Sequence, residues 1–218
     1  MKAMAEIRPF ERRDCAAVRH IAFQTGFMGE PVDWLWRDRD SFADLICNYY
    51  TQREPESVLV AERDGAVVGY LFGCIDSARA HGAVPREIRR LVRRGFLFVP
   101  GVAPFLWRSL ADIIRDRGTP PEDLADARWP AHLHINLLPA GRGRGLGRQL
   151  VNEWTGRLRR AAVPGIHLGT FAENRNGIAF FEACGFVRHG VPLPVPGFRT
   201  RAAQRMHVQW MVHSLAER

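Results

Sequence analysis

The sequence has few cysteines, and they are scattered at Cys15, Cys47, Cys74 and Cys184. Because no C-x-x-C pair occurs, neither a zinc site nor a disulfide framework is expected. Reduced, mostly buried thiols are typical of a cytosolic protein. The N-terminus also lacks an apolar run suited to a signal peptide, and no stretch is long and uncharged enough to span a bilayer. We therefore expect a cytoplasmic protein without a membrane partner.

Internal repeats, linkers and a second-domain boundary are absent as well. The 218 residues, with 46% hydrophobic and 25% charged side chains, are a natural size and composition for one domain with a substantial core. We expect a single domain over residues 1–218.

Signatures of nucleic-acid binding are missing too, although the net charge is +8. Neither a helix-turn-helix, a zinc finger nor an aromatic RNA-binding motif is found. Nucleic acid is therefore not expected as the main partner, and a polyanionic small ligand is another use for the positive charge.

A glycine-rich loop between a strand and a helix organises the chain. Residues 132–137 are predicted to form a strand, and the loop of residues 141–147 contains four glycines. Glycines let backbone approach a ligand closely, and the first N–H groups of a helix have no partner inside it. The helix after the loop has one apolar face, formed by Leu146, Leu150, Val151, Trp154 and Leu158. The segment predicts an anion cradle for a phosphate or pyrophosphate.

Two familiar glycine loops do not match. A Walker loop ends in Gly-Lys-Ser/Thr, whereas this loop ends in Gly147-Arg148-Gln149. A Rossmann fingerprint has G-x-G-x-x-G after a first strand, whereas these glycines are evenly spaced and lie late in the chain.

The loop instead fits R-x-x-G-x-G, with Arg142, Gly145 and Gly147, and this resembles the pyrophosphate loop of the GNAT acetyltransferases. After another predicted strand, 166–171, residues 174–186 resemble the family's N-x-x-A-x-x-F-Y-x-x-x-G-F segment. The two motifs occur in the family's order. The resemblance implies acetyl-CoA as the cofactor and direct acetyl transfer to an unidentified amine on a small molecule or protein.

The resemblance also implies that the fourth and fifth strands splay apart beside Leu137, so that backbone N–H groups meet pantetheine and the thioester carbonyl. Phe181 stands where the family often has a tyrosine that protonates the thiolate, and a phenyl ring cannot donate a proton. An inactive or weak pseudo-acetyltransferase, acting as a CoA- or partner-binding module, is therefore the alternative. The implied cofactor-binding residues are Leu137, Leu138, Arg142, Gly143, Arg144, Gly145, Leu146, Gly147, Arg148, Asn174, Phe180 and Phe181.

His134 and Asp76 are the candidate catalytic residues. His132, His134 and Asn136 share one face of their strand because alternate residues point the same way. Histidine titrates near working pH, so His134 could act as the base. A buried structural histidine is the other interpretation, and it stays open for His167 as well. Asp76 ends an apolar strand and either faces the site or caps a turn.

Trp34, His132 and Glu173 are the candidate substrate-binding residues. Trp34 lies in a loop rich in large side chains, between two predicted helices, and in the family this region covers the acceptor site. The loop could equally form hydrophobic contacts between the helices, and Glu173 could be a turn residue. No metal ligand set is predicted.

The implied fold is a mixed, mainly antiparallel α/β sheet of about seven strands, flanked by helices. A helical insertion over residues 77–130 separates the third and fourth strands. Together with residues 129–135, this insertion resembles bacterial acetyltransferases similar to the acetyltransferase-like C-terminal domain of O-GlcNAcase. A homodimer is left open.

Local patterns predict the remaining elements. A first strand is expected at 5–9. A helix then starts at 11, residues 26–31 break it, and a further helix runs up to 49 or 50. Residues 57–62 and 66–76 are expected to form a hairpin. A basic helix at 86–94 offers either a solvated face or a contact to the 3′-phosphate of CoA or a partner. Further elements are a strand at 187–191, a proline-rich connection at 192–198 and a last strand at 205–215. A helix at 102–117 is expected to bury Phe105, Leu106, Leu110, Ile113 and Ile114.

Overall fold

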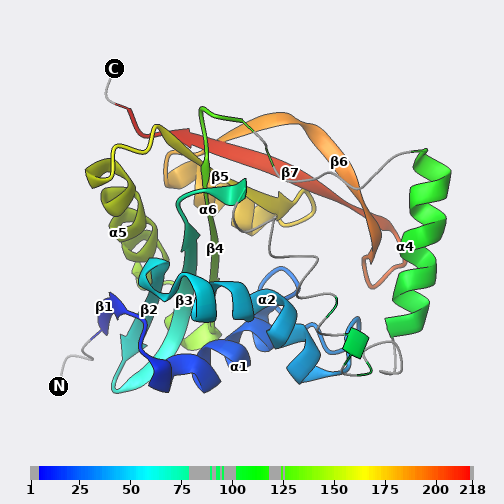
Figure 1. Ribbon diagram of the computed structural model, residues 1–218, viewed down its shortest axis with the longest axis horizontal. Helices are drawn as coiled ribbons and strands as arrows, with labels where there is room; N and C mark the ends of the chain where they lie inside the picture. The colour runs from blue at the N-terminus through cyan, green and yellow to red at the C-terminus, as the bar shows by residue number, and fades with distance from the viewer. Residues whose placement is uncertain are drawn as a thin grey trace.

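Seven strands form one sheet in the order β1-β2-β3-β4-β5-β7-β6 (Figure 1). The computed structural model describes residues 5–78, 102–117 and 126–216, together with 89, 92, 93, 95 and 124. β4 and β5 run parallel, and the other neighbouring pairs are antiparallel, which confirms the predicted mixed sheet. The strands are β1 (Ala5–Pro9), β2 (Val58–Arg63), β3 (Ala66–Cys74), β4 (Ala131–Leu137), β5 (Gly165–Phe171), β6 (Val187–Arg199) and β7 (Arg205–Ser214).

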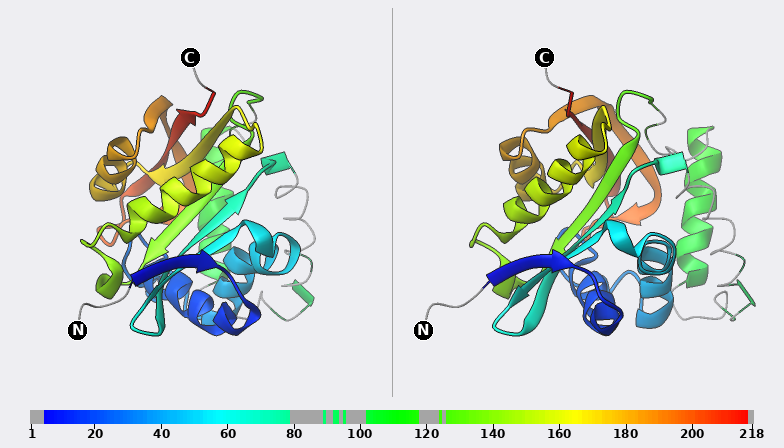
Figure 2. Two further views of the ribbon diagram at one scale, coloured as in Figure 1. Left: turned by 90° about the vertical axis from the view of Figure 1, so that its left-hand side faces the viewer. Right: turned by 60° about the vertical axis from the view of Figure 1, so that its left-hand side comes forward.

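Helices cover both faces of the sheet (Figure 2). α1 (Cys15–Thr25) and α2 (Arg39–Arg53) lie on one face, and α5 (Leu146–Arg160) and α6 (Arg175–Ala183) lie on the other. α4 (Val102–Asp116) stands apart, beside β6. Short 3₁₀ turns are η1 (Arg12–Asp14), η2 (Pro55–Ser57) and η4 (Pro139–Gly141). None of these helices is long and apolar enough to cross a membrane.

The predicted apolar face of α5 is confirmed, because its five apolar residues are buried against the sheet. Trp154 on this face lies directly over Gly73 of β3, where an added Cβ would come within 2.4 Å of the indole ring. β3 is almost wholly buried, as expected for an apolar central strand. The sheet beneath α5 is thus a tightly packed base for the glycine loop.

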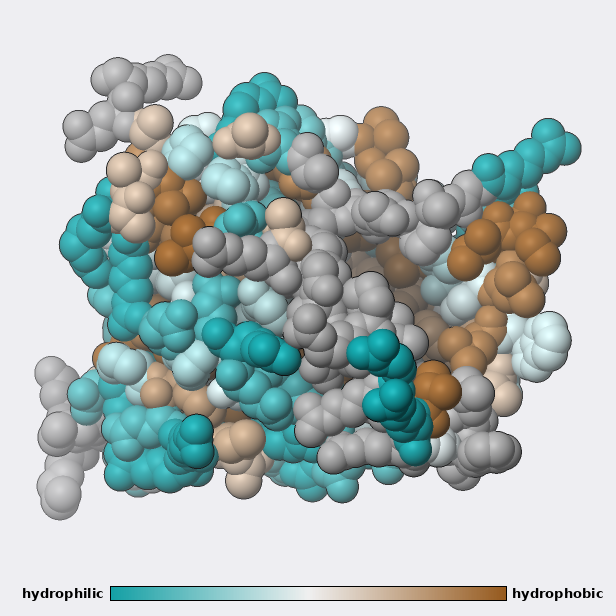
Figure 3. Space-filling model, in the orientation of Figure 1, coloured by the Kyte–Doolittle hydropathy of each residue, from teal (hydrophilic) through white to brown (hydrophobic). Residues whose placement is uncertain are grey.

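The predicted inner face of α4 is wrong at three positions. Leu106, Leu110 and Ile114 are 39%, 47% and 68% exposed, and hydrophobic residues gather over α4 in Figure 3. On the side that contacts β6, Phe105 packs as predicted and Asp112 binds Arg199 at 2.7 Å. An ion pair and an aromatic contact, rather than the apolar stripe, therefore decide which side faces the sheet. The predicted helix at 86–94 falls mostly outside the described residues.

The proline-rich connection predicted at 192–198 is also wrong, because these residues continue β6 as far as Arg199. β6 is an edge strand, and its pairing with β7 shifts register between His189 and Leu193 and again between Pro194 and Arg199. Proline is tolerated on an edge strand and at bulges, where its missing N–H breaks no inner ladder bond.

Candidate functional site

β4 and β5 diverge after a short paired stretch. Their ladder joins Ala131 to Ile166 and His132 to His167. β4 remains paired with β3 as far as Leu137, and β5 remains paired with β7 as far as Phe171. Among the described residues, those that follow His132 in β4 and His167 in β5 are therefore not paired with each other. Because backbone N–H and C=O groups need partners, this opening suits an extended ligand that pairs like an added strand.

The glycine loop begins at the end of β4, and its base is firmly held. The N–H group of Leu138 donates to the carbonyl of Val68 at 2.8 Å, and Arg63 donates to the carbonyl of Ala140 at 2.9 Å. A Cβ added at Gly141 would lie 3.2 Å from Val68, so the loop base packs directly on β3.

The apex of the loop is open in contrast. Gly143 and Gly145 have φ values of +69° and +78°, a region that glycine adopts without steric strain. No atom lies within 4 Å of a Cβ added at Gly143, and the nearest to one at Gly145 is Gln149 Nε2 at 3.9 Å. Among the residues that the structure describes, the N–H groups of Gly143, Arg144 and Gly145 have no backbone acceptor. The apex offers unused donors.

Positive charge surrounds these donors. Arg144 and Arg148 are exposed, and the first turn of α5 has no acidic residue. Cations are unfavourable for helix stability at this end, where the dipole is already positive. The same arrangement favours a bound anion. The loop therefore favours an anionic group.

Arg142 is directed elsewhere. Its Nε donates to the carbonyl of Leu137 at 2.9 Å, and its terminal nitrogen donates to the carbonyl of Gly29 in the loop between α1 and α2. Its guanidinium therefore links the glycine loop to the loop between α1 and α2.

The α6 motif lies beside the first turn of α5. Asn174 caps α6 by accepting a hydrogen bond from the Gly177 N–H at 3.0 Å. The ring of Phe180 comes within 3.2 Å of a Cβ added at Gly147, so glycine allows this approach. Phe181 is 8% exposed and packs against Phe186 in the core. Two of the predicted cofactor residues, Gly147 and Phe180, are thus adjacent, and Phe181 lies in the core.

His132 and His167 are buried and hydrogen-bonded. Nε2 of His132 lies 2.7 Å from the Tyr50 hydroxyl, and Nδ1 lies 2.7 Å from the Ser77 hydroxyl. Nδ1 of His167 lies 2.7 Å from the carbonyl of Trp129. Both histidines have buried polar partners, as expected for structural residues.

His134 lies on the same face but is exposed. Its ring is 5.5 Å from that of His132 and 5.8 Å from that of Tyr50, centroid to centroid. Next along the face, Asn136 donates to the hydroxyl of Tyr70 at 3.0 Å, and burial raises the pKa of Tyr70 well above its usual value. His134 is therefore the solvent-exposed histidine of this row, close to where the strands diverge.

The remaining predicted residues lie at separate places. Asp76 accepts a hydrogen bond from the N–H group of Ala78 at 3.1 Å, which is a turn cap. The carboxylate of Glu173 lies 3.0 Å from Nδ1 of His207 and also accepts the His207 N–H.

Trp34 belongs to an aromatic cluster between the α1–α2 loop, α4 and the β6–β7 hairpin. Its ring meets Phe27 edge-on at 4.8 Å, and Arg201 lies 5.6 Å above it. The indole N–H of Trp34 is buried and has no acceptor among the described residues. Sequence reasoning missed His207, Arg201 and Tyr50, because their partners are distant in the chain and no local pattern marks them.

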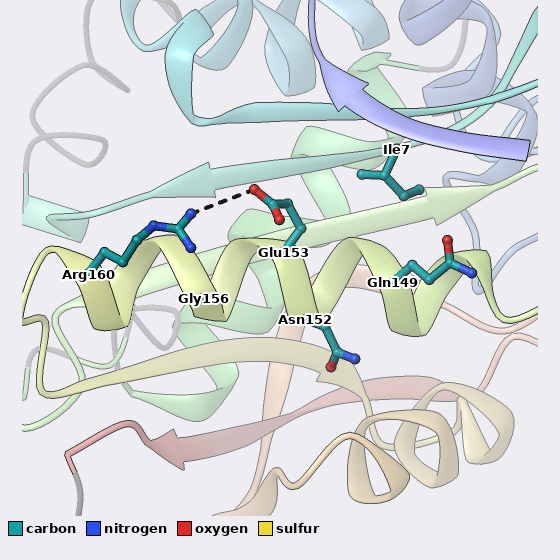
Figure 4. Close-up of a pocket in the computed structure, with 6 residues that line it drawn as sticks. All are labelled: Ile7, Gln149, Asn152, Glu153, Gly156 and Arg160. Carbon is teal, nitrogen blue, oxygen red and sulfur yellow. Dashed lines mark ion pairs between the residues drawn. The ribbon is translucent and has the colours of Figure 1, made fainter.

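A shallow groove lies elsewhere, along the flank of α5 towards Ile7 of β1 (Figure 4). Glu153 and Arg160 point towards each other across it, with 3.8 Å between their charged atoms. Its lining is polar and includes Gln149 and Asn152. The groove is distinct from the opening between β4 and β5.

Comparisons with known proteins agree on one family. The model of the acetyltransferase (GNAT) family matches residues 17–186. The chain is similar to SsHAT, at 25% identity and a TM-score of 0.65, over 98% of this chain and 99% of that one.

Two further similar structures were solved with acetyl-CoA. One is yncA from Salmonella typhimurium, at 18% identity and a TM-score of 0.59, over 99% of this chain and 96% of that one. The other is the phosphinothricin acetyltransferase Pat from Sinorhizobium meliloti, at 18% identity and a TM-score of 0.61, over 100% and 90% of the two chains. At this identity the likeness concerns the fold alone.

Proposed function

The chain belongs to the acetyltransferase (GNAT) family, and we propose that it moves an acetyl group from acetyl-CoA directly to an amine. The observation that carries this proposal is the opening between β4 and β5, with the glycine loop at its end. Such an opening accepts an extended chain between the strands while the loop binds its anionic group.

Backbone groups do most of the binding in this proposal. The N–H groups at the apex of the glycine loop, Arg144 and Arg148 hold the pyrophosphate, and the free edge of β4 near Leu137 and Leu138 receives the pantetheine arm. Asn174, Phe180 and Phe181 complete the predicted cofactor side. Acetyl-CoA supplies the acetyl group as a thioester. N–H groups of the same edge of β4 would stabilise negative charge on a carbonyl oxygen in the opening, without any special side chain.

His134 is the proposed base, and it must be neutral to accept a proton from the amine. Asp76 is retained as a second candidate, although its bond to Ala78 also explains its position. Phe181 cannot protonate a leaving group, so that proton comes from solvent or another residue. Burial raises the pKa of the Cys47 and Cys74 thiols to about 12, so neither is a ready nucleophile.

The acceptor is proposed to approach from the side of Trp34, with Glu173 as a further predicted contact. His132, the third predicted contact, is buried and hydrogen-bonded through both ring nitrogens. The amine itself stays unidentified. A single domain over residues 1–218, a cytoplasmic location and the likeness to the O-GlcNAcase-related acetyltransferases also remain proposals.

A substitution of His134 tests the chemistry. His134→Gln keeps much of the size of the side chain but cannot titrate, so kcat should fall by about 100-fold or more. The melting temperature and the affinity for acetyl-CoA should stay nearly unchanged, because the side chain is exposed. In the wild type the rate should fall as pH drops through the pKa of the base.

His132→Gln is the matched control on the same strand face. His132 is 6% exposed and bonded through both ring nitrogens, so this variant should lose stability. Normal turnover and an unchanged pH profile in His134→Gln would remove His134 from the mechanism. A thermal-shift and transfer screen with acetyl-CoA and a panel of amines tests the wider proposal. Binding without transfer would favour the pseudo-acetyltransferase alternative. Absence of acetyl-CoA binding would refute the transferase and the CoA-binding form of the alternative.

A further inference from the structure

Arg142 joins two segments that lie 113 residues apart in the chain. Through Nε it binds the carbonyl of Leu137, the last residue of β4, and through a terminal nitrogen it binds the carbonyl of Gly29. Within the described residues Arg142 has no acidic partner. Its hydrogen bonds therefore go to backbone carbonyls on both sides of the opening.

Gly29 belongs to a tight turn that depends on outside support. The N–H and C=O groups of Phe27 and Glu30 bind each other at 2.9 Å in both directions. Between them, Met28 and Gly29 have φ values of +53° and +89°, as in a type I′ turn. Methionine is strained in this region, since only glycine and, to a lesser degree, asparagine and aspartate visit it readily. Contacts from elsewhere must help to hold the turn.

The turn is linked to the last residue of β4 through Arg142 and contacts the last residue of β5 directly. Arg142 connects it to Leu137 at the end of β4. Phe27, at the start of the turn, lies 6.3 Å from Phe171 at the end of β5, and it also packs against Trp34. A Cβ added at Gly29 would lie 3.1 Å from the Arg142 guanidinium, so the contact is close. The turn thus borders the opening on the side proposed for the acceptor.

We propose that Arg142 is a positioning residue that couples occupation of the glycine loop to the conformation of the turn at residues 27–30. Because Arg142 is itself part of the loop, an anion that fixes the loop also fixes the guanidinium and, through Gly29, the turn. Coupling of this kind is reciprocal, so an ordered turn also favours binding at the loop. The coupling rests on the proposed function, whereas the contact between Arg142 and the turn does not.

Amide hydrogen exchange without any ligand tests the contact. In Arg142→Ala the amides of Phe27 and Glu30 should exchange at least about fivefold faster than in the wild type, the lower end of usual coupling effects. Arg144→Ala is the matched control, because it removes the same charge from the same loop and Arg144 contacts no described residue by hydrogen bond or ion pair. Equal exchange in all three proteins would overturn the proposal.

A rescue variant separates loss of support for the turn from general damage. Asn-Gly is the preferred pair for a type I′ turn, so Met28→Asn should make the turn less dependent on Arg142. Added to Arg142→Ala, it should restore slow exchange at Phe27 and Glu30. Failure of this rescue, with a normal melting temperature, would mean that the turn is not what Arg142 supports.

Saturating acetyl-CoA tests the coupling. Exchange at the turn should slow in the wild type, whereas Arg142→Ala with bound acetyl-CoA should show no such change. Acetyl-CoA that binds the wild type without slowing exchange at the turn would overturn the coupling. If the wild type binds no acetyl-CoA, the proposed function fails while the ligand-free experiment still judges the contact. Once an amine acceptor is identified, steady-state kinetics of Arg142→Ala should show a larger fold-increase in the acceptor KM than fold-decrease in kcat.

Discussion

Gly145 and Gly65 offer a matched test of the glycine loop. Their φ values are +78° and +79°, and an added Cβ would meet nothing nearer than 3.9 Å at Gly145 and nothing within 4 Å at Gly65. Alanine therefore introduces the same conformational strain at both positions, about 1–2 kcal/mol, and no clash. One position is in the loop, and the other is in the β2–β3 hairpin.

The strain should lower the melting temperature of Gly65→Ala and the acetyl-CoA affinity of Gly145→Ala. In the hairpin, β2 and β3 hold the turn, so Gly65→Ala should lower the melting temperature by about 2–8 °C and leave acetyl-CoA affinity unchanged. At the loop apex few contacts hold residue 145, so the free loop relaxes and the strain returns when the anion binds. Gly145→Ala should therefore raise the Kd for acetyl-CoA by about 5- to 30-fold.

Isothermal titration with acetyl-CoA and thermal melts of both variants provide the measurements. Equal affinities for the two variants would refute the assignment of the loop. A larger substitution, Gly145→Val, should weaken binding further in a protein that still folds, because the position faces open space. Unchanged acetyl-CoA affinity in folded Gly145→Val would also refute the assignment of the glycine loop.

Three further predictions concern the fold and the missing tyrosine. Phe181→Tyr should leave transfer activity unchanged or raise it, and abolished turnover with normal cofactor binding would indicate an unforeseen packing role. Gly73→Ala should lower the melting temperature strongly, because the new Cβ would lie 2.4 Å from the Trp154 ring. The Arg199 guanidinium lowers the pKa of Asp112 from 3.8 to about 2. The ionised Asp112 therefore stabilises the folded state fully above pH 3.8, and this contribution is lost as pH falls through 2. Between pH 5 and 2 the free energy of unfolding in urea should fall by at most about 2 kcal/mol from this group, and by less where solvent screens the pair. Asp112→Asn should remove this part of the pH dependence.

Local patterns predicted the elements around the site well, because each depends on neighbouring residues. The strand before the loop, the four glycines and the apolar face of α5 lie within one stretch, and the structure reproduces them. The hairpin of β2 and β3 is likewise set by its turn residues. Local patterns could not predict contacts between segments that are distant in the chain, such as the hydrogen bond between Arg142 and Gly29.

The errors at α4 and β6 have a common cause. The amphipathic pattern of α4 predicts one apolar side but cannot say which side meets the protein, and a charged pair between Asp112 and Arg199 decides it. The prolines of β6 suggest a connection because proline breaks an inner strand, but an edge strand tolerates them. In both cases the neighbouring element, which the local sequence does not contain, settles the outcome.

His132 and His134 show how one strand places two histidines in different surroundings. The two residues share a strand, a face and a residue type, and the sequence predicted His134 as a catalytic residue and His132 as a substrate-binding residue. At His132 the strands are still paired, and Tyr50 and Ser77 bind both ring nitrogens, so the imidazole is 6% exposed. Two residues later the strands have diverged and His134 is exposed. The divergence that leaves the later residues of β4 without a partner in β5 therefore coincides with the change from a buried to an exposed histidine.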